Sequence, residues 1–318
     1  MSDPTLGVIF ALIASTSWAV GAICARVGMR QVSSSTGTLI SLMAGFAAIS
    51  TITLIIDFDA VFSVSSTTLL WLALLGFIQF PVGRFLHYSG IQLAGVGLAS
   101  TVGGAVPLFA AIMAVIFLGE QMTFPIAVGT VAVVLGLALV MSRAYAQGLP
   151  KDPSSSRTSL HSVEPPQSQR ASRPLVIGIL CALGGAIAYA AGHNIARHVV
   201  TSTASAPITA SYTLFFGMVI LAVLSLPRLG EFLEAPRAAI LTMATSGVMS
   251  SLAIFFMYTA LSKAPVTLAS PLVALYPLIT MTLAHFFLQR LERITRGMVI
   301  GAIMVAIGVT FVIMGQTA

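Results

Sequence analysis

Charged residues are scarce in this sequence. Only 8% of the 318 residues are Asp, Glu, Lys or Arg and 57% are hydrophobic, whereas about 25% of the residues of soluble domains are charged. This composition excludes an ordinary soluble protein. The net charge of +6 describes how a chain is oriented in a membrane better than it describes a nucleic-acid-binding surface, so nucleic acid is not expected as a partner.

Cysteine and catalytic motifs are also scarce. Cys24 and Cys181 both fall within apolar runs, so they form neither a disulfide framework nor a metal-binding spacing. A membrane-embedded enzyme would need a nucleophile with a base, paired aspartates or a metal cluster. The apolar runs contain no paired Asp, no His-Glu-x-x-His and no Gly-x-Ser-x-Gly. An enzyme is therefore the disfavoured alternative, and no cofactor or metal is expected.

Long apolar runs occur along nearly the whole chain. Each is about 20 residues long, the length that a helix needs to cross the hydrocarbon core of a bilayer. We predict an all-α integral membrane protein of the plasma membrane (the inner membrane of a bacterium) with ten transmembrane helices. The predicted spans are residues 6–26, 36–56, 68–89, 95–118, 124–142, 175–196, 207–226, 239–261, 266–289 and 297–314.

One segment interrupts this pattern. Residues 146–173 are rich in Ser, Pro and charge, and such a segment cannot bury enough apolar surface to fold alone. We predict a disordered cytoplasmic linker there. It separates two units, residues 1–145 and residues 174–318, with five predicted helices in each.

The two units carry the same residues at matching positions. The stretch SWAVGAICAR (residues 17–26) matches AYAAGHNIAR (residues 188–197) at a separation of 171 residues (189 − 18), and Gly7 matches Gly178 at the same separation. Tyr88 and Tyr258 match at 170, LASTVGGAVPL (98–108) matches LASPLVALYPL (268–278), and Glu120 matches Glu292 at 172. The bias of membrane helices toward small residues does not produce such an ordered set by chance.

An odd number of helices per unit requires the second unit to lie inverted in the bilayer. Of the 15 Lys and Arg residues, 12 fall on one predicted side and two, Arg197 and Lys263, on the other. Two inverted copies that keep positive charge on one side produce this distribution. By the positive-inside rule, the linker lies in the cytoplasm and both termini lie outside. Arg26 and Arg197 are expected at opposite faces, where they cap helix ends.

The fourth and fifth predicted helices carry a specific pattern of Pro, Gly-Glu and Gly in VPLFAAIMAVIFLGEQMTFPIAVGTVAVVLG (residues 106–136). With this pattern the chain resembles the drug/metabolite transporter superfamily, specifically the EamA-type exporters with two five-helix repeats. The second copy, LQRLERITRGMVIG (residues 288–301), has Gln289-Arg290 in place of Gly-Glu. The resemblance implies a secondary transporter that exports small organic solutes by alternating access. Family members are often drawn with cytoplasmic termini, opposite to the charge count.

No carboxylate lies in the middle of a predicted helix. Ionisable groups inside a bilayer are costly, so their presence or absence there indicates function. The small multidrug-resistance relatives depend on a membrane carboxylate that exchanges protons for cationic drugs, and this sequence lacks one at such a position. A neutral, zwitterionic or anionic solute, such as an amino acid or a related compound, is therefore favoured. The acidic residues lie at a terminus, in loops or at helix ends: Asp3, Asp57, Asp59, Glu120, Asp152, Glu164, Glu231, Glu234 and Glu292.

Arg84 is the one basic residue that falls inside a predicted span, in QFPVGRFLHYSG (residues 79–90), and it has no basic counterpart in the other unit. A guanidinium offers a planar fork to a carboxylate, and His87 follows about one turn later. We therefore predict that Arg84 and His87 contact substrate. The alternative is that the Arg84 side chain extends to the membrane interface.

His193 and Asn194 interrupt the sixth predicted span without a counterpart in the first. Such a pair either joins helices through hydrogen bonds or contacts substrate, and we predict a substrate contact. His193 is also a candidate proton carrier, because histidine titrates near physiological pH.

Aromatic residues and prolines complete the candidate site. Aromatic side chains in membrane helices are often packing or interface residues. Inverted repeats, however, bring equivalent positions together around a site at the midplane of the membrane. We therefore expect Trp18 and Tyr189 to face each other. Pro107 and Pro277 are expected to kink their helices, either as gating points or as static bends. The predicted aromatic substrate contacts are Trp18, Tyr88, Tyr189, Tyr258 and Tyr276. An importer or a channel would share all of these features and stays an alternative.

Overall fold

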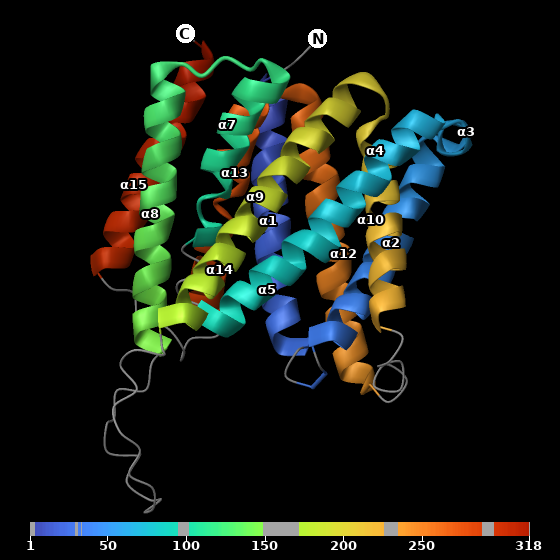
Figure 1. Cartoon of the computed structure of the whole chain (residues 1–318), viewed down its shortest axis with the longest axis horizontal. Helices are drawn as coiled ribbons and strands as arrows, with labels where there is room; N and C mark the ends of the chain where they lie inside the picture. The colour runs from blue at the N-terminus through green and yellow to red at the C-terminus, as the bar shows by residue number, and fades with distance from the viewer. Residues whose placement is uncertain are drawn as a thin grey trace, which may run out of the picture.

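The computed structural model describes residues 4–28, 31–32, 34–94, 102–148, 172–225, 235–287 and 296–317, and every regular element in these ranges is a helix (Figure 1). The predicted linker at 146–173 lies mostly outside the described residues, and Glu292 lies wholly outside them. The helices are α1 (Pro4–Gly28), α2 (Ser34–Ile56), α3 (Phe58–Phe62), α4 (Ser66–Phe77), η1 (Ile78–Val82), α5 (Gly83–Ala94), α7 (Val106–Leu118), α8 (Phe124–Gly148), α9 (Ser172–Ser202), α10 (Ala206–Ser225), α12 (Arg237–Lys263), α13 (Val266–Val273), α14 (Tyr276–Phe287) and α15 (Arg296–Thr317).

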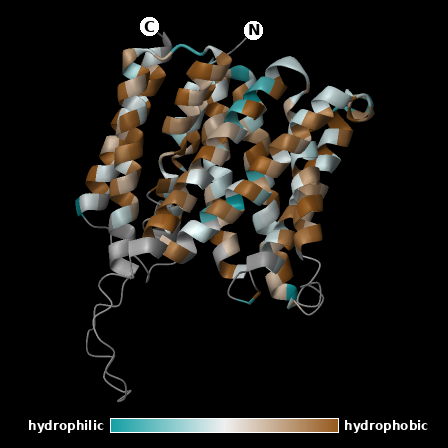
Figure 2. Ribbon diagram, in the orientation of Figure 1, coloured by the Kyte–Doolittle hydropathy of each residue, from teal (hydrophilic) through white to brown (hydrophobic). Residues whose placement is uncertain are grey.

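The helices have the length and the surface of membrane spans. Seven of them, in the described ranges, are long and apolar enough to cross a bilayer. Three shorter apolar segments, Val106–Leu118, Val266–Thr280 and Val299–Gly315, fall at the remaining predicted spans. Hydrophobic residues predominate along the helices (Figure 2), and large apolar side chains are exposed, as expected for a surface that faces lipid. The chain is a multi-pass integral membrane protein, while the count of ten spans stays a prediction.

The bundle has two distinct ends (Figure 1). We call the end where Pro4 and Thr317 lie the terminus end, and the end where α8 stops at Gly148 and α9 starts at Ser172 the linker end. Both described ends of the chain thus lie on the same side of the bundle. That agrees with termini on one side of the membrane, and which side is outside stays a prediction.

Equivalent helices of the two units pack against each other in opposite directions. A Cβ atom added to Gly129 of α8 would lie 2.5 Å from the carbonyl oxygen of Gly308 of α15, and one added to Gly136 would lie 2.7 Å from that of Gly301. As the residue number increases along α8, from Gly129 to Gly136, the residue number of the partner in α15 decreases, from Gly308 to Gly301. The two helices are therefore antiparallel. The glycines allow the two backbones to touch, as small residues do in membrane helix pairs.

A second contact between the units occurs twice, each time between the first helix of one unit and the third helix of the other. Gly7 of α1 lies against Ala264 after α12, and the matching Gly178 of α9 lies against Ala94 of α5. The first helix of each unit therefore packs on the third helix of the other unit. Each unit thus makes the same contact with the other, as expected for two copies of one repeated unit.

The third predicted span contains a π-helix, η1, which includes Pro81. A single π-turn inserts one extra residue into an α-helix, and the equivalent helix α12 is α-helical throughout. At the start of this turn, Gly192 of α9 lies against Gln79, the second residue of η1, while its match Gly21 of α1 lies against Ser250, so Gln79 and Ser250 are separated by 171 residues (250 − 79). After it, the tyrosines match at 170. The π-turn therefore explains why the repeat loses one residue of separation.

Two helices are interrupted at equivalent places. Residues 102–103 are helical, residues 104–105 form a turn, and α7 follows; in the second unit α13 ends, residues 274–275 form a turn, and α14 follows. Pro107 and Pro277 are each the second residue of the helix after the turn. Proline is well suited to the first turn of a helix, where its missing N–H has no helical partner anyway. The prolines therefore begin a half-helix rather than kink a continuous one.

Candidate functional site

Helix α9 crosses the region where both interrupted helices lie, since α7 and α13 pack against each other and against α9. His193 is 7% exposed, and its Nδ1 atom lies 3.1 Å from the hydroxyl oxygen of Ser270, in the middle of α13. Which of the two groups donates depends on the imidazole tautomer. The prediction missed Ser270 because an isolated serine in an apolar run carries no signal of its own.

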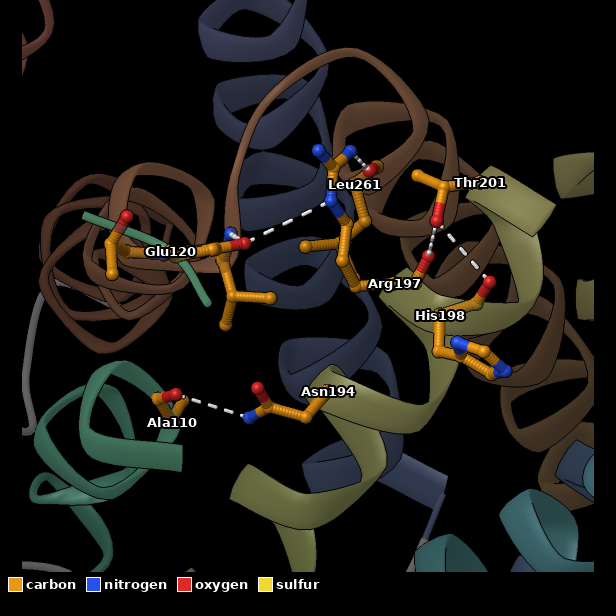
Figure 3. A network of polar contacts seen from close by, with 9 residues as sticks. Ala110, Glu120, Asn194, Arg197, His198, Thr201 and Leu261 are labelled. Carbon is orange, nitrogen blue, oxygen red and sulfur yellow. Dashed lines mark hydrogen bonds and ion pairs between the residues drawn. The ribbon is translucent and has the colours of Figure 1, made fainter. Parts of the chain in front are cut away.

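Asn194 has a fixed orientation at the next position of α9. Its Nδ2 atom donates hydrogen bonds to the carbonyl oxygens of Ala190, at 2.9 Å, and of Ala110 in α7, at 3.1 Å (Figure 3). Because both partners are acceptors, the amide nitrogen must face them and Oδ1 must point away. Within the described part of the chain, this buried oxygen has no hydrogen-bond partner. A fixed, unpartnered acceptor is available for a donor group of a ligand.

Ser15 of α1 binds the end of α13. Its hydroxyl donates to the carbonyl oxygens of Leu272, at 2.8 Å, and Val273, at 3.2 Å. The Leu272 carbonyl also accepts the backbone N–H of Leu275, at 3.2 Å, whereas the residue four positions after Val273 is Pro277, which has no N–H to donate. No local sequence pattern indicates this contact, since Ser15 and Leu272 are 257 residues apart.

Aromatic side chains surround the interrupted helices, but in other pairs than expected. Trp18 lies against Tyr276, the first residue of α14, with ring centroids 6.3 Å apart, and Tyr189 lies against His87, with centroids 6.4 Å apart. Trp18 and Tyr189 were expected to face each other, and the structure gives each a partner from the opposite unit instead. Tyr189 approaches this closely because Gly83 has no side chain; a Cβ there would meet its ring at 2.9 Å.

The other predicted contacts have different surroundings. Tyr258 is 1% exposed and belongs to the hydrophobic core, which fits a packing role. The side chain of Tyr88 lies outside the described residues. The guanidinium of Arg84 lies 6.0 Å from the centroid of the Phe80 ring, one turn earlier in the same span. A cation above an aromatic face is favourable at this distance, and Arg84 as a whole is half-buried.

Gln79 is a further polar residue that the sequence reasoning missed. It lies in η1, is 7% exposed and packs against Gly192, the residue before His193. In the described structure, its side-chain oxygen has no hydrogen-bond partner. The signal available in the sequence was a lone glutamine two residues before Pro81 in an apolar run.

Glu120 and Arg197 form a polar network at the terminus end (Figures 1 and 3). The Glu120 carboxylate accepts hydrogen bonds from the backbone N–H groups of Val266, at 2.7 Å, and Thr267, at 3.0 Å. Arg197 Nε lies 3.8 Å from Glu120 Oε1, and its Nη1 donates to the carbonyl oxygen of Leu261. Arg197 lies within α9 and not at its end, and its guanidinium binds a carbonyl in the last turn of α12, whereas the side chain of Arg26 lies outside the described residues.

Comparisons with known proteins identify the family and the fold of this chain. A model of the EamA-like transporter family matches twice, over residues 5–142 and residues 176–314. A crystal structure described only as that of a protein has a TM-score of 0.71 to this chain, with 14% identity over 98% of each chain, which shows a shared fold. No curated protein matches the chain. The two matches of the family model cover both repeated units, and the chain therefore belongs to the EamA-like transporter family.

Proposed function

We propose that the protein is a secondary transporter that exports a small organic metabolite, such as an amino acid or a related compound, by alternating access. The observation that carries this proposal is the meeting of two interrupted helices and α9 between the inverted units. Transporters with inverted repeats bind substrate near the midplane at such interruptions, where backbone groups are free of helical partners. Ser270, His193 and Asn194 supply polar atoms there.

The polar groups of this region favour a solute without net positive charge. Near the interruptions the described side chains offer an imidazole, an amide, hydroxyls and aromatic faces. The nearest carboxylate in the described network, Glu120, is bound by two backbone N–H groups at the terminus end. An amine of a zwitterion would bind Asn194 Oδ1, and the aromatic rings would stack with an apolar part of the solute.

The class of substrate is tested first by a growth-resistance screen of overexpressing cells against amino acids, their analogues and drugs. A compound found there is then measured in proteoliposomes, where we expect saturable transport. Right-side-out and everted vesicles compared with the same compound determine the direction of net flux. Non-saturable flux would contradict a transporter mechanism, and net flux inward would make the protein an importer.

Replacing Asn194 by leucine is expected to lower the transport rate about tenfold or more, because the charge-assisted hydrogen bond from a substrate amine to Asn194 Oδ1 is worth about 1.5–3 kcal/mol. The measurement is initial flux of the screened compound in proteoliposomes with equal amounts of folded protein. The matched control is Phe124→Ala, a side chain that is 82% exposed. Equal flux in Asn194→Leu and the control would show that Asn194 only joins α9 to α7.

Arg84→Ala is expected to lower transport of carboxylated substrates about tenfold and that of neutral analogues much less, because only a carboxylate uses the guanidinium fork. The comparison is made with one substrate and its carboxamide. Arg296→Ala, an exposed arginine at the start of α15, is the control for loss of one positive charge. An equal effect on both compounds would mean that Arg84 serves packing against Phe80.

A further inference from the structure

The short helix α13 is held at three points. All of its residues, Val266–Val273, are buried. Glu120 accepts hydrogen bonds from its first two N–H groups, Ser270 in its middle contacts His193, and Ser15 binds the carbonyls at its end. Two of these three partners, Glu120 and Ser15, belong to the first unit. A movement of α13 relative to the first unit therefore requires these bonds to break.

Glu120 is the strongest of the three attachments. The first N–H groups of a helix have no helical partner and carry partial positive charge, so they favour an anion. Pro265, which precedes α13, provides no side-chain cap, and the carboxylate of Glu120 takes that place. Hydrogen bonds to an ionised acceptor are roughly twice as strong as neutral ones. The guanidinium of Arg197, at 3.8 Å, adds a weaker attraction.

The same carboxylate joins three elements of the second unit to the first. It binds α13 directly, and through Arg197 it is linked to α9 and to the carbonyl of Leu261 near the end of α12. Glu120 follows Gly119, whose φ of 66° is left-handed and which ends α7. Because glycine alone adopts this conformation without steric cost, the chain can turn there and place Glu120 over the start of α13 (Figure 3).

We propose that Glu120 is a positioning residue for transport. While the Glu120 carboxylate is bound to the N–H groups of Val266 and Thr267, α13 closes the terminus end of the substrate pathway. When these hydrogen bonds to Glu120 break, α13 can move, and the site at His193 and Ser270 becomes accessible from the terminus end. This inference rests on the proposed transport function, but it concerns the closed end and not the identity or direction of the solute.

The test measures access to α13 from the terminus end. A reporter cysteine is placed at Ala269, which is 0% exposed, in a chain with Cys24→Ser and Cys181→Ser. A membrane-impermeant maleimide is added on the side of the termini. We expect Glu120→Ala to raise the labelling rate at least about tenfold, and Glu120→Gln, which keeps an uncharged acceptor, to raise it about threefold. Asp59→Asn, an exposed carboxylate in α3 at the same end, should leave the rate unchanged.

A charge exchange separates helix capping from a simple ion pair. In the double variant E120R/R197E the ion pair can form again, but an arginine cannot accept hydrogen bonds from the N–H groups of α13. We expect its labelling rate to match that of Glu120→Ala. Restored protection in the double variant would overturn the proposal, since the ion pair alone would then close this end.

Labelling of Glu120→Ala and Glu120→Gln at the parent rate, in protein that elutes as one monodisperse peak, would also overturn the proposal. If Glu120→Ala does not fold, Glu120→Gln alone decides the result. Labelling requires no substrate. Failure of every transport assay would therefore overturn the proposed function without changing the labelling rates, and the two failures are distinguishable.

Discussion

Gly247→Ala is expected to leave little folded protein after detergent extraction. A Cβ at Gly247 of α12 would lie 2.6 Å from the carbonyl carbon and 2.7 Å from the Cα of Ser41 in α2. Overpacking of a core costs about 1–3 kcal/mol, and we expect the upper end here because backbone, unlike a side chain, cannot turn away. A loss of about 3 kcal/mol lowers the ratio of folded to unfolded protein more than a hundredfold.

The measurement is thermal unfolding followed by size-exclusion chromatography, with two glycine controls. At Gly184 the nearest atom to an added Cβ is the flexible Leu86 Cδ1, at 3.2 Å, so Gly184→Ala should be neutral or slightly stabilising. Gly76 is the repeat equivalent of Gly247, and its closest obstacles lie at 2.9 Å, so Gly76→Ala should fall between the two. Gly247→Ala with the melting temperature of Gly184→Ala would contradict this packing between α12 and α2.

His193→Gln is expected to abolish proton-driven accumulation while passive exchange of substrate continues. If His193 carries one proton per substrate, a pH difference of about two units sustains a concentration ratio of about a hundredfold, because each unit is equivalent to about 1.4 kcal/mol. Glutamine keeps a side chain that can bond to Ser270 but cannot carry the proton. The ratio should therefore fall to about one in the variant.

Accumulation of the screened substrate is measured in proteoliposomes with an imposed pH difference. His198→Gln is the matched control, since His198 lies on the same helix and contacts the ring of Trp71 at a centroid distance of 5.1 Å. Ser270→Ala removes the hydrogen-bond partner of His193 and should retain accumulation. Full accumulation in His193→Gln would assign coupling to another group.

The sequence was most informative about helices and about symmetry. Apolar runs of bilayer length predict where helices lie, because a chain in lipid must satisfy its backbone internally. Matching glycines such as Gly7 and Gly178 predicted two related units, and the structure places them in equivalent contacts, against Ala264 and Ala94. The separation of matching residues falls from 171 to 170 at the tyrosines of the third helices, and only the structure shows that a π-turn accounts for this change.

The site was predicted less completely, for physical reasons. His193 and Asn194 were identified because polar side chains are costly in an apolar helix, and this reasoning names a residue without naming its partner. Ser15 and Ser270 were missed because serine can bond to its own helix and so is common in apolar segments. Glu120 was placed correctly at a helix end, but its binding to α13 joins residues about 146 apart in sequence, which no local pattern indicates.

The π-turn η1 has a consequence for how the two units exchange conformations. In the proposed alternating-access mechanism, one repeat moves against the other around a fixed site, and the two open states would be equivalent if the two repeats were identical. Pro81 and the extra residue of the π-turn occur in the third helix of the first unit, whereas α12, the third helix of the second unit, is α-helical throughout. The third helices therefore have different shapes, and the two open states are not related by symmetry. No symmetry then requires the two open states to have equal free energies, and η1 is a local feature that can favour one of them in the absence of a gradient.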